Sequence, residues 1–169
     1  QWRYFEARLG ELTGGDRAAA RALYARAATA PEFHGFLAAD RIDAPYPLCP
    51  WTPAAQPALQ QQVAAMPALQ RAFPLYRIGR KDWALREWKD ALAGLDDERR
   101  RLAVGLAQDN GWFDRAVFDL GGDNPQESRL YDLRFPLHHQ DAIRREAARN
   151  RIDPAWIAAE IRAESVFDP

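Results

Sequence analysis

The chain has 169 residues, 47% of them apolar and 28% charged, which is typical of a soluble globular protein with one or two domains. Its formal net charge of −1 provides no basic surface for nucleic acid or anionic lipid, and no apolar run is long enough to span a bilayer. A single cysteine, Cys49, excludes a disulfide bond within the chain.

The beginning of the chain is predicted to be helical. Trp2–Leu12 has the pattern of the second helix of a hairpin, and residues 13–16 form a turn whose last residue, Asp16, caps the next helix. That helix, Arg17–Ala28, is amphipathic, and a shorter helix is predicted over Phe33–Arg41. The pattern is similar to that of tetratricopeptide-like repeats, but it fits any antiparallel helix pair equally well.

A proline-rich segment follows. Residues 43–53 include four prolines and cannot form the interior of a helix. We therefore expect an extended linker, whose apolar residues Tyr46, Leu48 and Trp51 pack on neighbouring helices.

The middle of the chain is predicted to fold into helices joined by short connections. Six helices are expected: Pro57–Met66, Pro67–Ile78, Trp83–Leu95, Asp97–Asn110, Trp112–Leu120 and Gln126–Arg134. Asp82 is the expected cap of the third, and Gly79, Gly94, Gly111 and the pair Gly121-Gly122 are expected helix stops. No strand pattern occurs, and short connections make neighbouring helices antiparallel. The predicted fold is therefore all-α, with helix hairpins stacked into a superhelix.

The last part of the chain changes character at residues 134–137, Arg-Phe-Pro-Leu, which interrupt the helical pattern. An amphipathic helix is predicted from His139 to Asn150. The final helix is expected to begin at Pro154 with Asp153 as its N-cap, because the Asp side chain can accept first-turn N–H groups and proline needs no donor there. Pro169 is expected to stop it.

One carboxylate on this final helix has a distinctive position. At about 100° per residue, Glu164 shares a face with Ile157 and Ile161, whereas Arg162 points to the opposite side. We expect Glu164 to lie on the buried face in the last turn, where desolvation, the helix dipole and the nearby Glu160 all favour its protonated form. Such a group suits a general acid, although a glutamate bent outward into water at a helix end is an equally good interpretation of the geometry alone.

Other kinds of site find little support. The adjacent His138 and His139, the distant His34 and the single Cys49 have no metal-ligand spacing, so no metal site is predicted. No phosphate-binding glycine loop or Gly-x-Ser-x-Gly motif is present. We predict no cofactor.

The string Arg162-Ala163-Glu164-Ser165-Val166-Phe167-Asp168-Pro169 resembles the first motif of the soluble lytic murein transglycosylases. In that family a helix ends in Glu-Ser, followed by an aromatic residue and Asp-Pro or Asn-Pro. Residues 134–137 also resemble the segment that leads into the catalytic domain of that family, and the upstream helices resemble its superhelical part. The resemblance therefore covers essentially the whole chain.

The resemblance implies four regions. Residues 1–43 would be the end of a superhelical, U-type helical-repeat region, and 44–58 a proline-rich linker. Residues 59–136 would form the superhelical linker (L) domain. Residues 137–169 would be the N-terminal part of a lysozyme-like catalytic domain.

It also implies an activity, namely non-hydrolytic cleavage of the N-acetylmuramic acid–N-acetylglucosamine β-1,4 bond of peptidoglycan to give 1,6-anhydro ends. Glu164 would be the single catalytic acid/base and Ser165 would lie at the substrate. The expected partner is the peptidoglycan glycan strand, in the periplasm of a Gram-negative cell; no signal peptide is found at Gln1, and protein partners are not indicated.

The chain ends five residues after Glu164, and the family's later groove motifs do not follow. We therefore expect a fragment that is inactive alone. The alternative hypothesis is a non-catalytic helical-repeat module that binds a protein or glycan on its concave face.

Overall fold

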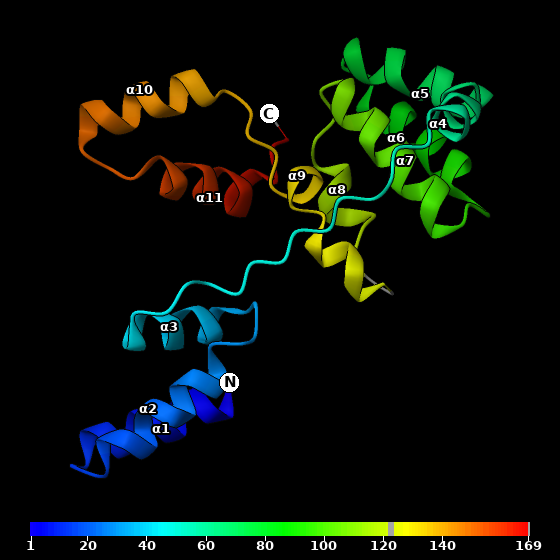
Figure 1. Cartoon of the computed structure of the whole chain (residues 1–169). Coiled ribbons are helices and arrows are strands. Elements are labelled where there is room, and N and C mark those ends of the chain that lie inside the picture. Colours follow the sequence, from blue (N-terminus) through cyan, green and yellow to red (C-terminus); the bar gives the residue numbers. More distant parts are fainter. Residues whose placement is uncertain (122–123, 169) are drawn as a thin grey trace. The chain divides into compact units, whose positions relative to one another are not determined.

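The computed structural model describes residues 1–121 and 124–168 (Figure 1). Their regular structure is entirely helical, which confirms the all-α prediction. Gly122 as a helix stop and Pro169 as the end of the last helix are predictions that lie outside the described residues. The chain divides into two compact units, Gln1–Pro50 and Trp51–Pro169, which we call the N-terminal unit and the C-terminal unit.

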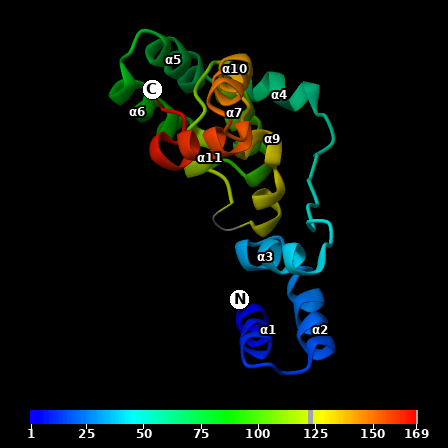
Figure 2. The ribbon, with the colours of Figure 1, turned by 90° about the vertical axis from the view of Figure 1, so that its left-hand side faces the viewer.

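The N-terminal unit contains three helices: α1 (Trp2–Leu12), α2 (Arg17–Ala27) and α3 (Phe33–Ile42). Helices α1 and α2 lie side by side as a hairpin (Figure 2). Asp16 caps α2 as predicted, because its Oδ1 accepts the Ala18 N–H at 2.8 Å. Tyr24, 2% exposed, fills the small core among alanines of all three helices.

The C-terminal unit begins with four helices that form its main core: α4 (Pro57–Ala64), α5 (Pro67–Arg77), α6 (Lys81–Leu92) and α7 (Asp97–Asp109). They agree with the predicted helices within a few residues. Two differences concern α6. It starts at Lys81 rather than Trp83, and Asp82 lies inside the first turn instead of capping it, where a carboxylate still complements the helix dipole.

Aromatic side chains fill the centre of this core. Trp88 is 1% exposed, and its ring lies 5.4 Å from that of Trp112, which stacks on Tyr76 at 4.6 Å. The Trp88 indole Nε1–H donates to Asp119 Oδ2 at 3.0 Å. Burial raises the pKa of the Asp119 carboxyl.

The predicted helix Trp112–Leu120 is wrong over most of its length. Only α8 (Arg115–Phe118) is helical, because the preceding residues close α7 instead. Gly111 adopts a positive φ of 79°, and the Trp112 N–H donates back to Ala107 O at 2.8 Å, which turns the Trp112 ring into the core.

The predicted helix Gln126–Arg134 is also wrong as a continuous element. It is divided into a 3₁₀ helix, η1 (Pro125–Arg129), and α9 (Tyr131–Arg134). Leu130 between them has a non-helical ψ of 67° and is 3% exposed, so burial of its side chain interrupts the helix. The buried Glu127 carboxylate accepts the Gly121 N–H at 2.9 Å.

The linker prediction is partly correct. Trp51 packs as expected: its N–H donates to Arg129 O at 2.8 Å and its ring lies 4.8 Å below the Arg101 guanidinium. Tyr46 contacts Phe36 but remains 50% exposed. The prediction for Leu48 is wrong, because its side chain is 55% exposed.

Two helices complete the C-terminal unit, α10 (Gln140–Asn150) and α11 (Pro154–Ser165), packed against each other (Figure 1). Ala147 of α10 is buried, but α11 has no buried residue. This pair carries the residues for which the sequence predicts a function.

Candidate active site

The start of α11 is determined locally and agrees with the prediction. Asp153 Oδ1 accepts the Ala155 N–H at 2.8 Å, and Pro154 occupies the first helical position. The cap holds the first turn of the helix that carries Glu164 and Ser165.

Glu164 lies in the last turn of α11, but not where the sequence predicts. Its side chain is exposed, whereas Ile157 and Ile161 on the same face are half-buried. The predicted burial of Glu164 is therefore wrong for this structure, because the described residues do not cover that end of the face. Within them, no donor lies at hydrogen-bonding distance from the Glu164 carboxylate.

The opposite face of α11 makes the closer contacts. Arg162 is half-buried, its Nε–H donates to Arg134 O at 3.0 Å, and its guanidinium lies 4.6 Å above the Phe135 ring. Burial, and secondly the Arg134 charge, lower the pKa of Arg162. These contacts hold α11 against the segment that precedes α10.

An apolar cavity of about 270 Å³ lies along this face; it is lined by Phe135, Pro136, Leu137, Ala155, Ala158, Ala159, Arg162 and Phe167. A second, of about 180 Å³, adjoins it beside α10 and shares Pro136, Leu137, Ala155 and Ala158 with the first. Neither is lined by Glu164.

The end of α11 has an unusual backbone. Val166 and Phe167 have φ values of 46° and 62°, so two successive non-glycine residues adopt the left-handed conformation. This conformation is strained, especially for the β-branched valine. Such strain persists only where surrounding contacts fix it, and it is frequent at active sites.

Two contacts fix this turn, and neither is evident from the sequence. Lys81 Nζ, at the start of α6, pairs with Asp168 Oδ1 at 2.6 Å. The Phe167 ring lies edge-on to His138 at 5.9 Å. Burial lowers the pKa of the His138 imidazole, with a smaller contribution from His139. Lys81 and His138 are both far from the turn in the sequence, so only the tertiary structure reveals these contacts.

Ser165 is the last residue of α11 and is half-buried. Its Oγ–H donates to Ile161 O at 2.8 Å, which leaves the oxygen lone pairs able to accept from another group. Ser165 and Glu164 are adjacent, but the structure joins them by no hydrogen bond.

Clusters of three or more His, Cys, Asp or Glu side chains that could hold a metal ion are absent from the part of the chain that the structure describes. No helix formed by residues 1–121 and 124–168 is long and apolar enough to cross a membrane.

Comparison with known proteins finds a family model that matches the middle of the chain. Residues 62–121 match the model of the soluble lytic murein transglycosylase L domain. This segment spans α5, α6, α7 and α8, the aromatic core described above. No curated protein matches the chain.

Solved structures match nearly its whole length. An inactive mutant of lytic transglycosylase Slt from Pseudomonas aeruginosa, with one glutamate replaced by glutamine, is 31% identical with a TM-score of 0.76 and covers 98% of this chain. The 70-kDa soluble lytic transglycosylase from Escherichia coli has 22% identity, a TM-score of 0.78 and 98% coverage. A bulgecin A complex of a 70-kDa soluble lytic transglycosylase has 22% identity, a TM-score of 0.77 and 99% coverage.

The fold and these likenesses define an all-helical protein that is similar to the helical superhelix region of those enzymes. The chain belongs to the soluble lytic murein transglycosylase family. It spans 27% of the Pseudomonas aeruginosa chain and 26% of the Escherichia coli chain, about a quarter of each.

Proposed function

We propose that this chain is part of a peptidoglycan lytic transglycosylase in which Glu164 is the catalytic acid/base. The observation that carries the proposal is the string Glu-Ser-Val-Phe-Asp-Pro, which begins at the end of α11, in a chain of this family. The strained turn at Val166 and Phe167, fixed by contacts from other elements, supports a functional role for the motif. The domain assignment 137–169 as the start of a lysozyme-like domain belongs to the same proposal.

The proposed reaction needs one carboxyl group and consumes no water. Glu164 as acid protonates the oxygen that links C1 of N-acetylmuramic acid to N-acetylglucosamine, and the C1–O bond breaks. Glu164, now a carboxylate, then takes the proton of the C6 hydroxyl as O6 attacks C1. The products are a free 4-hydroxyl on N-acetylglucosamine and a 1,6-anhydro ring, and Glu164 is again protonated. A hydrolase of the usual kind would need a second carboxylate.

Ser165 would contact the glycan beside the reacting bond through its free lone pairs. The substrate would be the glycan strand of peptidoglycan, and the protein would act on it in the periplasm. In the Pseudomonas aeruginosa relative, the inactive mutant differs by a single glutamate-to-glutamine change, which is consistent with a single essential carboxyl group.

The test is Glu164→Gln in the natural gene product that contains this chain. Glutamine keeps the shape and removes the titrating proton. Because one residue serves both proton transfers, we expect release of 1,6-anhydromuropeptides to fall by at least ~10²–10⁴-fold. Products are identified by chromatography and mass spectrometry. The exposed side chain of Glu164 predicts that thermal stability stays unchanged.

Glu160→Gln is the matched control, since Glu160 lies one turn earlier and is exposed, and its Oε1 accepts the Trp156 indole N–H at 3.3 Å. Its activity should stay near that of the wild type. Retained activity in Glu164→Gln would reject the residue, and products that have gained water would reject the mechanism.

The 169-residue chain alone should release no product, because its Glu164 is exposed and lines neither cavity beside α11. A natural gene product without lytic activity would favour the alternative, a helical-repeat binding module.

A further inference from the structure

The N-terminal unit contains a cavity that the proposed chemistry does not use. It has a volume of about 670 Å³ and lies where α1, α2 and α3 meet; its lining is Arg8, Glu11, Gly14, Gly15, Arg17, Ala20, Arg21, Tyr24, Arg41 and Ile42. This volume falls within the usual range for small-molecule sites.

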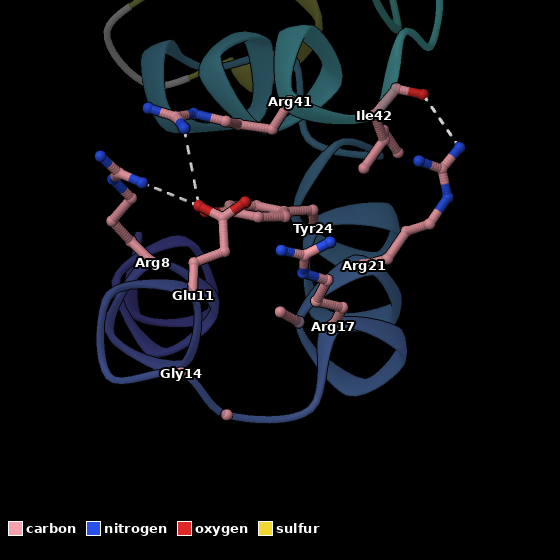
Figure 3. Close-up of a pocket in the computed structure, with 10 residues that line it drawn as sticks. Arg8, Glu11, Gly14, Arg17, Arg21, Tyr24, Arg41 and Ile42 are labelled. Carbon is pink, nitrogen blue, oxygen red and sulfur yellow. Dashed lines mark hydrogen bonds and ion pairs between the residues drawn. The ribbon is translucent and has the colours of Figure 1, made fainter.

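The charge of the lining is strongly positive. Four arginines and one glutamate face the cavity, an excess of three positive charges in a chain whose net charge is −1 (Figure 3). Arginine guanidinium groups bind carboxylate and phosphate oxygens through paired hydrogen bonds.

Donors from three elements converge on one oxygen of the Glu11 carboxylate. Its Oε2 accepts from the Tyr24 hydroxyl at 2.8 Å and from Arg8 at 2.8 Å, and lies 3.5 Å from Arg41. The Tyr24 hydrogen bond, followed by that of Arg8, lowers the pKa of the Glu11 carboxyl. Glu11 therefore stays ionised at neutral pH and holds Arg8 and Arg41 at the cavity wall.

The two remaining arginines have no acidic partner within the described residues. Arg21 donates to the neutral carbonyl of Ile42 at 3.2 Å, and no partner is found there for Arg17 (Figure 3). They are four residues apart on α2 and share one face, where like charges repel. Arg17 also occupies the first position of α2, where the helix dipole disfavours a cation. Both placements cost stability in the free chain, and a bound anion would remove that cost.

We propose that this cavity binds a ligand carrying a doubly charged oxyanion group, either paired carboxylates or a phosphate. Arg17 and Arg21 supply the hydrogen bonds to it, while Arg8 and Arg41, held by Glu11, supply a fixed positive field. The site lies in the N-terminal unit, whereas Glu164 belongs to the C-terminal unit, so the inference is independent of the proposed function.

Isothermal titration calorimetry on the 169-residue chain at constant ionic strength tests the inference. The probes are citrate, which carries several carboxylates, and inorganic pyrophosphate, with acetate as a singly charged reference. Tighter binding of citrate identifies a paired-carboxylate ligand, and tighter binding of pyrophosphate identifies a phosphorylated one. We expect acetate to bind at least ~10-fold more weakly than the preferred probe.

The variants Arg17→Gln and Arg21→Gln should each weaken binding of the preferred probe by ~10-fold or more. Their unfolding temperatures should stay unchanged or rise, because like charges on α2 are separated. Arg26→Gln is the matched control: it removes the same charge from the same helix, but Arg26 does not line this cavity. The proposal is overturned if neither probe binds, or if Arg26→Gln weakens binding as much as the two cavity variants do.

Discussion

At the scale of single residues, the ion pair between Lys81 and Asp168 joins the start of α6 to the residue that follows the strained turn. Both side chains are substantially exposed, at 47% and 43%. Surface ion pairs add little to stability. We therefore infer that the Lys81–Asp168 pair serves to position the end of α11.

We therefore predict that Lys81→Gln in the natural gene product lowers kcat by up to ~10²-fold, leaves KM nearly unchanged and barely alters the unfolding temperature. Lys81→Arg should restore most of the activity, because it keeps the charge. Arg80→Gln, which removes a charge one residue earlier, is the control. An unchanged kcat in Lys81→Gln would show that the ion pair is not needed for positioning.

His138 makes the C-terminal unit sensitive to acid. Burial lowers the pKa of its imidazole below the ordinary value of 6.5, and its Nε2 has no partner among the described residues. As pH falls below about 6.5, the unfolded chain takes up a proton that the folded chain resists. The free energy of unfolding should then fall as pH drops towards the folded-state pKa, and it should level off below that pKa, where the imidazole is protonated in both states.

We predict that the unfolding temperature of the wild type declines between pH 7 and pH 5 more steeply than that of His138→Gln, which cannot titrate. The measurement is thermal unfolding followed by circular dichroism. His34→Gln is the control, because it removes a histidine from the N-terminal unit and leaves both His138 and His139 in place. Parallel pH profiles for the wild type and His138→Gln would contradict the assignment.

At the scale of elements, α11 depends more than the other long helices on its own local interactions. It has no buried residue, so tertiary packing stabilises it less than α5 or α6. The hydrogen bond from the Ala155 N–H to Asp153 therefore contributes a large share of what holds its first turn.

Asp153→Ala should destabilise α11 by ~1 kcal/mol, the usual cost of losing an N-cap. The loss should appear as faster hydrogen exchange of α11 amides, with the amides of α5 unchanged. Asp153→Asn keeps a capping oxygen and should exchange like the wild type. Asp141→Ala is a second control, because no side-chain cap is formed at the start of α10. Unchanged exchange in Asp153→Ala would show that packing, not the cap, holds the helix.

At the scale of the whole molecule, each unit has its own core. The core of the C-terminal unit surrounds Trp88, and that of the N-terminal unit surrounds Tyr24. Trp88 is among the largest fully buried side chains, and its truncation leaves a cavity between α5, α6 and the segment after α7.

Trp88→Ala should lower the free energy of unfolding of the C-terminal unit by ~3–5 kcal/mol. Chemical denaturation followed by residue-resolved hydrogen exchange gives this value and shows which amides lose protection. Trp88→Phe retains most of the packing but loses the hydrogen bond to Asp119, so its loss should be smaller. Equal losses in the two variants would place the stabilisation in the hydrogen bond instead of the packing.

The sequence by itself determined the features that depend on near neighbours. Helix content follows from apolar spacing, and the caps at Asp16 and Asp153 follow from side chains that bond two residues along the chain. The motif at the end of α11 is a contiguous string of residues, so the hypothesis for Glu164 and Ser165 follows from the amino-acid sequence alone.

Only the tertiary structure decided features that depend on distant partners. The helices predicted around Trp112 and Leu130 are interrupted because burying those side chains in the core outweighs local helix preference. Periodicity placed Glu164 on the face of Ile157 and Ile161, but burial requires another element over that face, and the described chain supplies none there. The arginine cavity likewise exists because three helices converge, since Arg8, Arg21 and Arg41 are too far apart in the sequence to indicate a common site.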